Sequence, residues 1–414
     1  MNRPSPPLFH GVVLVTSATI GAGIFSLPIV SAGMWFGWTA ACLFAIWLLS
    51  YLGALLLLEA TLVYPRGASF YTIVNGILGA KWNLATSIGM AFLMYILIYA
   101  YISAGGNIIN HTFASITGGE SPISQNVSSV LFAAFFATLI WFGATLVSRL
   151  CTVLMIGMAV SYLLFNAGLV LHVEIFKLFN TQVQGESYSQ YIWAALPYFL
   201  TSFGFAGLVP SLVKYYGPEP KTVHRCMLYG TLITLGLYLI WILVAFGTLS
   251  RGSWVPVIAA GGNIADLIVG FQGVTEAHSQ NMSLLLNLFS NFAVTSSISA
   301  VGLVMFDYIT DAFGFDDDAT GRLKSLLIAF GPPALVCLFF PHGFIVAIGY
   351  AGLVMIFGYF LVPARLVLKL RSDQLETPFR VWGGSPLVYG VLAFSLLIGV
   401  FEVMSMFDAL PVYP

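Results

Sequence analysis

The chain consists of long apolar runs separated by short polar segments. Between Pro4 and Leu58, only His10 has an ionisable side chain of the Asp, Glu, Lys, Arg or His type. A membrane-spanning helix needs about 20 apolar residues, so this run predicts two helices that fold back at Ser31–Trp38. The same pattern along the chain predicts eleven transmembrane helices, at 8–32, 36–63, 86–113, 127–147, 150–172, 190–214, 226–249, 282–308, 324–341, 343–367 and 386–409.

The composition agrees with this all-α, polytopic membrane architecture. Of the 414 residues, 59% are hydrophobic and 7% are charged, whereas a soluble domain has about 25% charged residues. This excludes a soluble enzyme, and also a nucleic-acid-binding protein, which would need a basic face. The four cysteines have neither zinc-site nor CxxC spacing, and we expect no metal framework and no cofactor. No small-residue cleavage site follows the first apolar segment, which we interpret as a retained span.

The lysines and arginines predict the orientation, because these residues collect in cytoplasmic loops. With a cytoplasmic N-terminus and eleven spans, 13 of the 15 lysines and arginines fall on the inner side, and only Lys177 and Arg251 fall outside. The C-terminus would then lie outside the cell.

Two of the predicted helices contain closely spaced glycines followed by a proline. Thr19–Pro28 reads TIGAGIFSLP, and Ser202–Pro210 reads SFGFAGLVP. These segments begin two successive sets of five spans, and the second set is inverted because five is odd. This pattern is typical of inverted-repeat transporters with a site at the bilayer midplane. It predicts one transporter domain, 1–414, with repeats at about 8–172 and 190–367 and an extra helix at about 386–409. Close helix packing at the glycines is the structural alternative.

An interrupted helix would present backbone groups suited to a zwitterion. Unwinding over Gly21, Ala22 and Gly23 frees N–H groups at the start of the outer half-helix, near Ile24, and these donors suit a carboxylate. The freed carbonyl groups suit an ammonium or a small cation. A molecule with both groups is an α-amino acid, and we predict an amino acid substrate.

Several motifs resemble those of the bacterial hydroxy and aromatic amino acid permeases. They include TIGAGIFSLP, YILIYAYISAGG (Tyr95–Gly106), FGFDDDATGRLK (Phe313–Lys324) and FPHGFIVAIGYAGL (Phe340–Leu353), and the resemblance extends from end to end. The YYGPEPKT and LPVY segments fit the tryptophan-specific branch best. The resemblance implies a LeuT-type fold, location in the bacterial inner membrane, and proton-driven uptake of aromatic amino acids, with tryptophan favoured.

The candidate substrate-binding residues follow from the breaks and the resemblance. Phe203 and Phe205 flank Gly204 and could hold an aromatic ring, although many aromatic residues of this chain must instead face lipid. Tyr101 matches the substrate-facing tyrosine of the wider fold. On the eighth span, Ser296 could line the site, or could only form interhelical hydrogen bonds.

The sequence leaves two candidates for the ion that drives transport, a proton and sodium. Glu59 and Asp307 are ionisable residues within spans and are candidates for coupling or gating, with a structural ion pair as the alternative for Glu59. The chain has Met158 where the family commonly has a lysine, and Ala206 where a histidine is common. Sodium at Ser296 and Ser297 therefore remains an alternative to the proton.

We predict a secondary active importer that works by proton symport and alternating access, with an amino acid substrate, a coupling ion and the lipid bilayer as its partners. Tryptophan, tyrosine and phenylalanine remain open as substrates. A membrane-embedded enzyme or a channel is a remote alternative, because the chain lacks a HExxH motif, a nucleophile–His set and a filter motif.

Overall fold

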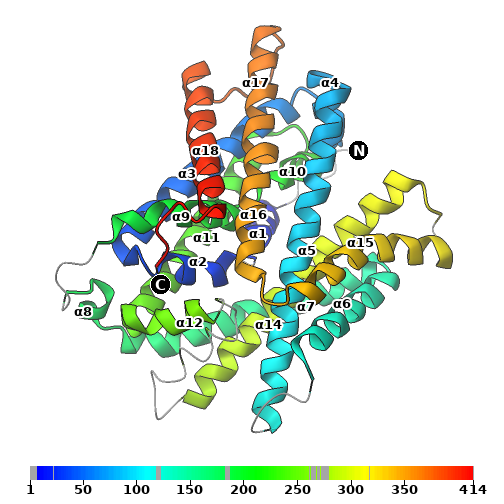
Figure 1. Ribbon diagram of the computed structural model, residues 1–414. Coiled ribbons are helices and arrows are strands. Elements are labelled where there is room, and N and C mark those ends of the chain that lie inside the picture. Colours follow the sequence, from blue (N-terminus) through cyan, green and yellow to red (C-terminus); the bar gives the residue numbers. More distant parts are fainter. Residues whose placement is uncertain are drawn as a thin grey trace.

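The computed structural model describes residues 7–21, 23–117, 123–181, 187–260, 262, 267, 271, 279–316 and 318–413. Every regular element in these ranges is a helix (Figure 1). Helices predominate because a peptide in lipid must satisfy its own backbone hydrogen bonds. Nine of the described helices are long and apolar enough to span a membrane, and the bent pair α1–α2 would be a tenth. The protein is therefore a polytopic helical membrane protein.

The helices of the first half of the chain follow the predicted segments. They are α1 (Leu8–Thr19), α2 (Gly23–Ser31), α3 (Trp35–Thr61), α4 (Phe70–Leu78), α5 (Ala80–Thr117), α6 (Gln125–Trp141), α7 (Ala144–Leu169) and α8 (Ile175–Leu178). The chain reverses between Ser31 and Trp35, within the predicted fold-back. α6 lies at the predicted fourth span but has only 17 residues, and α4 is a short helix outside the predicted spans.

The second half of the chain contains the remaining helices. They are α9 (Ile192–Ser202), the 3₁₀ turn η3 (Ala206–Leu208), α10 (Val209–Tyr216), α11 (Pro220–Thr248), α12 (Val255–Ala259), α14 (Ser279–Phe313), α15 (Ala319–Phe339), α16 (Phe344–Met355), the π-helical turn η5 (Ile356–Leu361), α17 (Val362–Ser372) and α18 (Gly384–Met406). α16, η5 and α17 together form one candidate span, as do α9, η3 and α10.

Both predicted helix breaks are present. α1 ends at Thr19 and α2 begins at Gly23, with an angle of 51° between them. α9 ends at Ser202, and regular α-helix resumes at Val209. α2 packs against α9, and α1 packs against α11, so the two breaks meet inside the protein.

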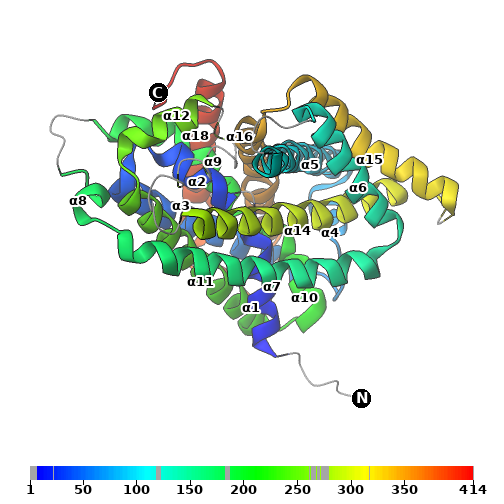
Figure 2. The ribbon, with the colours of Figure 1, turned by 90° about the horizontal axis from the view of Figure 1, so that it is seen from below.

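The other long helices surround this centre. α14 lies alongside α7 over much of its length and also contacts α5 (Figure 2). Outer faces carry large exposed apolar side chains such as Phe44, Phe135 and Leu163. A water-soluble protein rarely exposes so many, whereas lipid accommodates them.

An ion pair joins the ends of α3 and α17. Arg371 of α17 donates from Nε to Oε1 of Glu59 at 2.8 Å and from Nη2 to Oε2 at 2.7 Å, and the backbone N–H of Val381 donates to the same Oε2. Glu59 is fully buried and the Arg371 side chain is 8% exposed. A buried carboxylate with a bidentate guanidinium is neutralised where it lies, so this pair fixes α3 to α17.

We expect Arg371→Gln to destabilise the protein by about 3–5 kcal/mol, because it leaves the Glu59 carboxylate buried without its cation. Thermal unfolding of the detergent-purified protein measures this. The matched control is Lys369→Gln on the same helix. Lys369 forms an exposed hydrogen bond to Asp373 that lowers the pKa of this carboxyl group, and exposed pairs contribute at most about 1 kcal/mol. Equal melting temperatures for the two variants would contradict the assignment.

Candidate functional site

A cavity of about 400 Å³ lies where the two breaks meet. Small-molecule sites commonly have volumes of about 300–1,000 Å³. The part of its wall that the structure describes contains no charged side chain. The lining residues are Ala18, Thr19, Gly21, Gly23, Met90, Leu93, Met94, Leu97, Tyr101, Thr201, Gly204, Phe205, Gly207, Leu208, Ala300, Val301, Val304, Ile348, Met355 and Tyr359. An apolar cavity bordered by helix ends suits a ligand with a large apolar group and a compact polar group.

The glycines at the breaks allow close packing around this cavity. A Cβ atom at Gly23 would lie 2.6 Å from the Cα of Ser202, so α2 and α9 touch backbone to backbone. A Cβ at Gly204 would lie 2.7 Å from the methyl carbon of Met355, and one at Gly207 would lie 2.7 Å from the hydroxyl of Tyr359. Gly21 differs, because its nearest neighbour would be the Tyr101 hydroxyl at 3.3 Å.

Two side chains of α11 donate hydrogen bonds to carbonyl groups at the ends of α1 and α9 and in the first turn of α2. The Tyr238 hydroxyl lies 2.9 Å from the carbonyl oxygens of both Thr19 and Ser202, the last residues of α1 and α9. It has one proton and donates to one of them at a time. Trp241 donates from Nε1 to the carbonyl oxygen of Ile24 at 2.8 Å. Each carbonyl oxygen has two lone pairs, so Thr19 and Ser202 keep the capacity to accept a further hydrogen bond.

The aromatic residues separate into two groups. Phe205, Tyr101 and Tyr359 line the cavity. Phe203, although it also flanks Gly204, is outside the lining and packs edge-on against Tyr238, with ring centroids 5.3 Å apart. Phe203 thus supports the residue that bridges the two breaks.

Three other predicted residues lie beside the cavity rather than in its wall. Ile24 is buried and belongs to the wall of a neighbouring cavity. Ser296 donates within its own helix to the carbonyl oxygen of Ala293 at 3.1 Å. Ser297 lies closer to the break, with its Oγ 4.0 Å from a Cβ placed at Gly21. The predicted position Ala22 lies outside the described residues.

The two candidate coupling residues have different surroundings. Glu59 is held by Arg371 as described above, an arrangement that matches the structural alternative. Asp307 is an exposed residue of α14, three positions beyond Val304 of the cavity wall, and therefore continues the same face of that helix. The nearby Arg322 donates to the carbonyl oxygen of Trp141 at 2.7 Å, and the Lys324 ammonium lies 5.7 Å from the Phe315 ring centroid.

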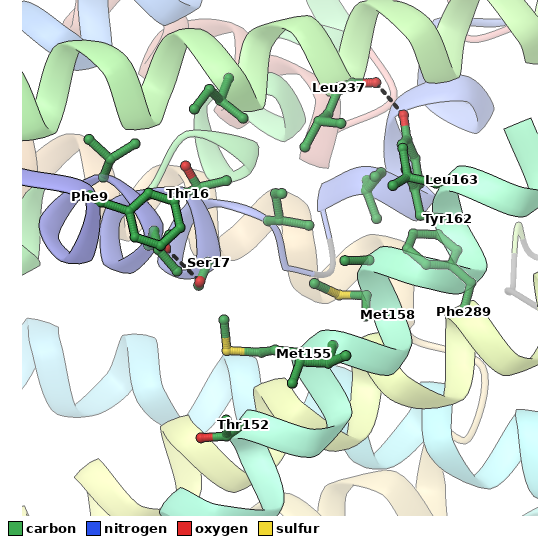
Figure 3. A pocket seen from close by; sticks show the side chains of 17 residues that line it. Phe9, Thr16, Ser17, Thr152, Met155, Met158, Tyr162, Leu163, Leu237 and Phe289 are labelled. Carbon is green, nitrogen blue, oxygen red and sulfur yellow. Dashed lines mark hydrogen bonds between the residues drawn. The ribbon is translucent and has the colours of Figure 1, made fainter.

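A second, strongly apolar cavity of about 620 Å³ separates α1 from α7 (Figure 3). Met155 and Met158 of α7 face Phe9 and Thr16 of α1 across it. Met158 is therefore in an apolar surrounding, without a charged residue in the described part of the wall.

Arg251, which follows α11, is buried at the end of the protein opposite the Glu59–Arg371 ion pair. Arg251 is 5% exposed and donates to the carbonyl oxygen of Gly33, at the turn after α2. Its guanidinium lies 4.7 Å from the Tyr188 ring centroid and 4.4 Å from that of Tyr413. These cation–π contacts tie the C-terminal segment to the turn that caps α2.

Sequence reasoning missed several residues of the site. Tyr238 and Trp241 lie on an unbroken helix, and no local pattern distinguishes them from other aromatic residues. Met355 and Tyr359 flank or lie in the π-helical turn η5, which carries no sequence signal but is a frequent feature of functional sites. Gly204 and Gly207 were the only indication that other side chains approach this break.

An apolar cavity at the meeting point of two interrupted spans defines a membrane carrier for a small molecule. The comparison with known families specifies the class further. Residues 4–402 match the tryptophan/tyrosine permease family, and the chain belongs to that family.

Curated relatives agree along the whole chain. It is 42% identical over 412 residues to a tryptophan-specific transport protein of Shigella flexneri, a match that covers 100% of this chain and 98% of that protein. It is 36% identical over 405 residues to a low affinity tryptophan permease of Escherichia coli (strain K12), covering 97% of each. A tyrosine permease of Enterobacter agglomerans is 39% identical over 376 residues, covering 90% of this chain and 89% of that protein. These relatives are transport proteins and permeases, not enzymes, and the resemblance seen in the motifs is confirmed.

We expect Gly23→Ala to lower the stability of the folded protein by about 1–3 kcal/mol, because the new methyl group forces α2 and α9 apart. Thermal unfolding in detergent measures this. Gly21→Ala is the matched control, since its methyl group meets only a side-chain hydroxyl. It should keep the melting temperature and raise the apparent KM for substrate. The reverse order of melting temperatures would contradict the close contact at Gly23.

Phe205→Ala should weaken binding of aromatic amino acids by about 0.5–1.5 kcal/mol beyond the loss of buried area, because it removes a ring from the cavity wall. Competition against labelled tryptophan by tryptophan, tyrosine, phenylalanine and alanine measures the change. Phe203→Ala, outside the wall, should reduce stability without altering the order of competitors. An equal loss for alanine in Phe205→Ala would rule out ring contact.

Proposed function

We propose that this protein imports aromatic amino acids, tryptophan in preference, across the bacterial inner membrane by proton symport. The observation that carries the proposal is the cavity between the two helix breaks, with ring-bearing walls and backbone groups at its ends. Membership of the tryptophan/tyrosine permease family supports the substrate class. The name of the relative at 42% identity supports tryptophan over tyrosine, since the tyrosine permease is 39% identical.

The proposed architecture is a LeuT-type 5+5 inverted repeat with one further span and a cytoplasmic N-terminus. The eleven spans would be the nine candidates of the described chain, the bent pair α1–α2, and the shorter apolar helix α6. The repeats would cover about 8–172 and 190–367 of a single domain, with α18 as the extra helix. The matching breaks at the start of each repeat support this arrangement.

The substrate's polar end would bind at the breaks. Its carboxylate would lie at the N-terminus of α2, near Gly21 and Gly23, where free N–H groups and the positive end of the helix dipole favour an anion. Its ammonium would share the carbonyl oxygens of Thr19 and Ser202 with the Tyr238 hydroxyl. The ring would extend between Phe205 and Tyr101. No charged side chain is needed, because the two helix ends provide complementary partial charges.

The cavity's position supports alternating access. Its wall extends from the breaks along α5 and α14 to Met90 and Val304, toward the ends that the positive-inside rule assigns to the cytoplasm. Arg251 and its aromatic neighbours close the opposite side. We infer an inward-facing arrangement, from which the half-helices α2 and α9 would tilt to open the outer side.

The choice of coupling ion in this proposal rests on the family resemblance. A sodium ion would require several oxygen ligands, and Ser296, whose hydroxyl donates to the carbonyl oxygen of Ala293, lies outside the cavity wall. Ser297 lies near Gly21 and keeps sodium as the second candidate. The family resemblance favours the proton.

Purified protein in sodium-free vesicles should accumulate labelled tryptophan when the outside is made acidic, because inward proton flow supplies the driving force. The control is the same vesicles with an ionophore that collapses the pH gradient. Accumulation that requires a sodium gradient and ignores the pH gradient would refute proton symport.

A further inference from the structure

A carboxyl group on the extra helix is buried without a cation. Glu402 lies in the last quarter of α18, near the end where the chain reaches the outer side, and is 4% exposed. Its Oε2 has no hydrogen-bond partner within the described residues. The sequence pattern alone marks Glu402 only as an isolated acid in an apolar span, and the proposed transport cycle so far makes no use of it.

The groups that face Glu402 in the described part of the chain are uncharged. A Cβ placed at Gly349 of α16 would lie 2.8 Å from Oε1 of Glu402 and 3.1 Å from the hydroxyl of Tyr198 of α9. Tyr350 of α16 is the other titratable group in this cluster. α18 packs against α3, α9, α16, η5 and α17. The charged residues on these elements are Glu59, Arg365, Lys369 and Arg371, and all of them lie toward the opposite, cytoplasmic end.

The burial of Glu402 determines the protonation state of its carboxyl group in this arrangement. An ionised carboxylate loses its hydration in an apolar interior and is strongly disfavoured unless a cation or several donors replace the water. Glu402 has neither among the described residues, so the neutral acid is the form compatible with the packing seen here. If α18 and α9 separated and water entered, the carboxyl group would release its proton.

The contact behind Glu402 leads directly to the cavity. Gly349 and Gly352 bring α16 close to α9, where a Cβ at Gly352 would lie 2.5 Å from the carbonyl oxygen of Pro197. Thr201 of α9 donates to the carbonyl oxygen of Ile348 at 2.9 Å, and Thr201 and Ile348 both line the cavity. α9 thus lies between the carboxyl group on one side and the candidate substrate site on the other.

We propose that Glu402 is a proton-binding site of this transporter, and that its protonation is required for α9 to pack against α16 and α18. The carboxylate takes one proton from the outer side as α9 closes, and it releases that proton to the inward-open cavity as α9 loosens from α18 after the substrate has left. Proton and substrate then move in the same direction, and proton binding is linked to the arrangement of the substrate site. This inference rests on the proposed proton symport and names the group that binds the proton.

The test compares net transport with exchange in proteoliposomes, using Glu402→Gln, which keeps the shape of the neutral acid but cannot bind or release a proton. A gradient of one pH unit supports about tenfold accumulation for one proton per substrate. Wild type should approach this ratio, whereas Glu402→Gln should stay near equal concentrations. Counterflow of labelled tryptophan at equal pH should persist in the variant, because exchange needs no net proton movement.

Glu219→Gln is the matched control, because Glu219 is exposed at the start of α11 and outside both cavities. It should accumulate tryptophan as wild type does. Tryptophan affinity should fall as pH rises in wild type and in the control, and should not depend on pH in Glu402→Gln. Tyr198→Phe, which removes the hydroxyl that faces the carboxyl group, should move the midpoint of this dependence to higher pH.

The outcomes separate the two proposals. If wild type accumulates tryptophan with the pH gradient and Glu402→Gln does so equally, Glu402 is structural and the inference alone is overturned. If accumulation of tryptophan by wild type does not depend on the pH gradient, both proton symport and this inference are overturned. If Glu402→Gln loses counterflow as well, Tyr198→Phe decides, and an unchanged midpoint in that variant overturns the inference.

Discussion

The backbone hydrogen bonds at the two helix breaks are the constraint on which the rest of the structure depends. A helix interrupted in a bilayer must have its freed carbonyl groups satisfied by protein or by ligand. Tyr238 reaches the last carbonyl groups of α1 and α9 together, and Trp241 reaches that of Ile24, the second residue of α2. α11 therefore holds the ends of the two broken helices together. The carbonyl oxygens of Thr19 and Ser202 can each still accept a further hydrogen bond.

Glycine makes that arrangement possible at the level of packing. Without Cβ atoms at Gly23, Gly204 and Gly207, the chain can bring α2 onto α9 and admit Met355 and Tyr359 beside the second break. The cavity is what remains between these close contacts. The same residues thus account for both alternatives raised by the sequence, because close helix packing at the breaks borders the cavity that we propose as the substrate site.

The charged and polar groups are distributed according to depth. Glu59 and Arg371 neutralise each other at the proposed cytoplasmic end, and Arg251 is held by carbonyl groups and aromatic rings at the outer end. The described cavity wall between them contains helix ends and no charged side chain. Glu402 is the exception, because it is a buried acid that has no such compensation among its described neighbours and therefore depends on a proton.

The sequence by itself determined the polytopic helical architecture, the positions of the breaks and the family, because apolar length, glycine–proline spacing and motif identity are local properties. It also placed Gly21, Gly23, Tyr101, Gly204 and Phe205 at one site, since each borders a break or matches a motif. Only the tertiary structure separated Phe203 from Phe205, paired Glu59 with Arg371, brought Tyr238 and Tyr359 to the breaks, and buried Glu402 beside Tyr198. These depend on the rotation of one helix against another, and an almost uniformly apolar helix carries no polar face from which that rotation can be read.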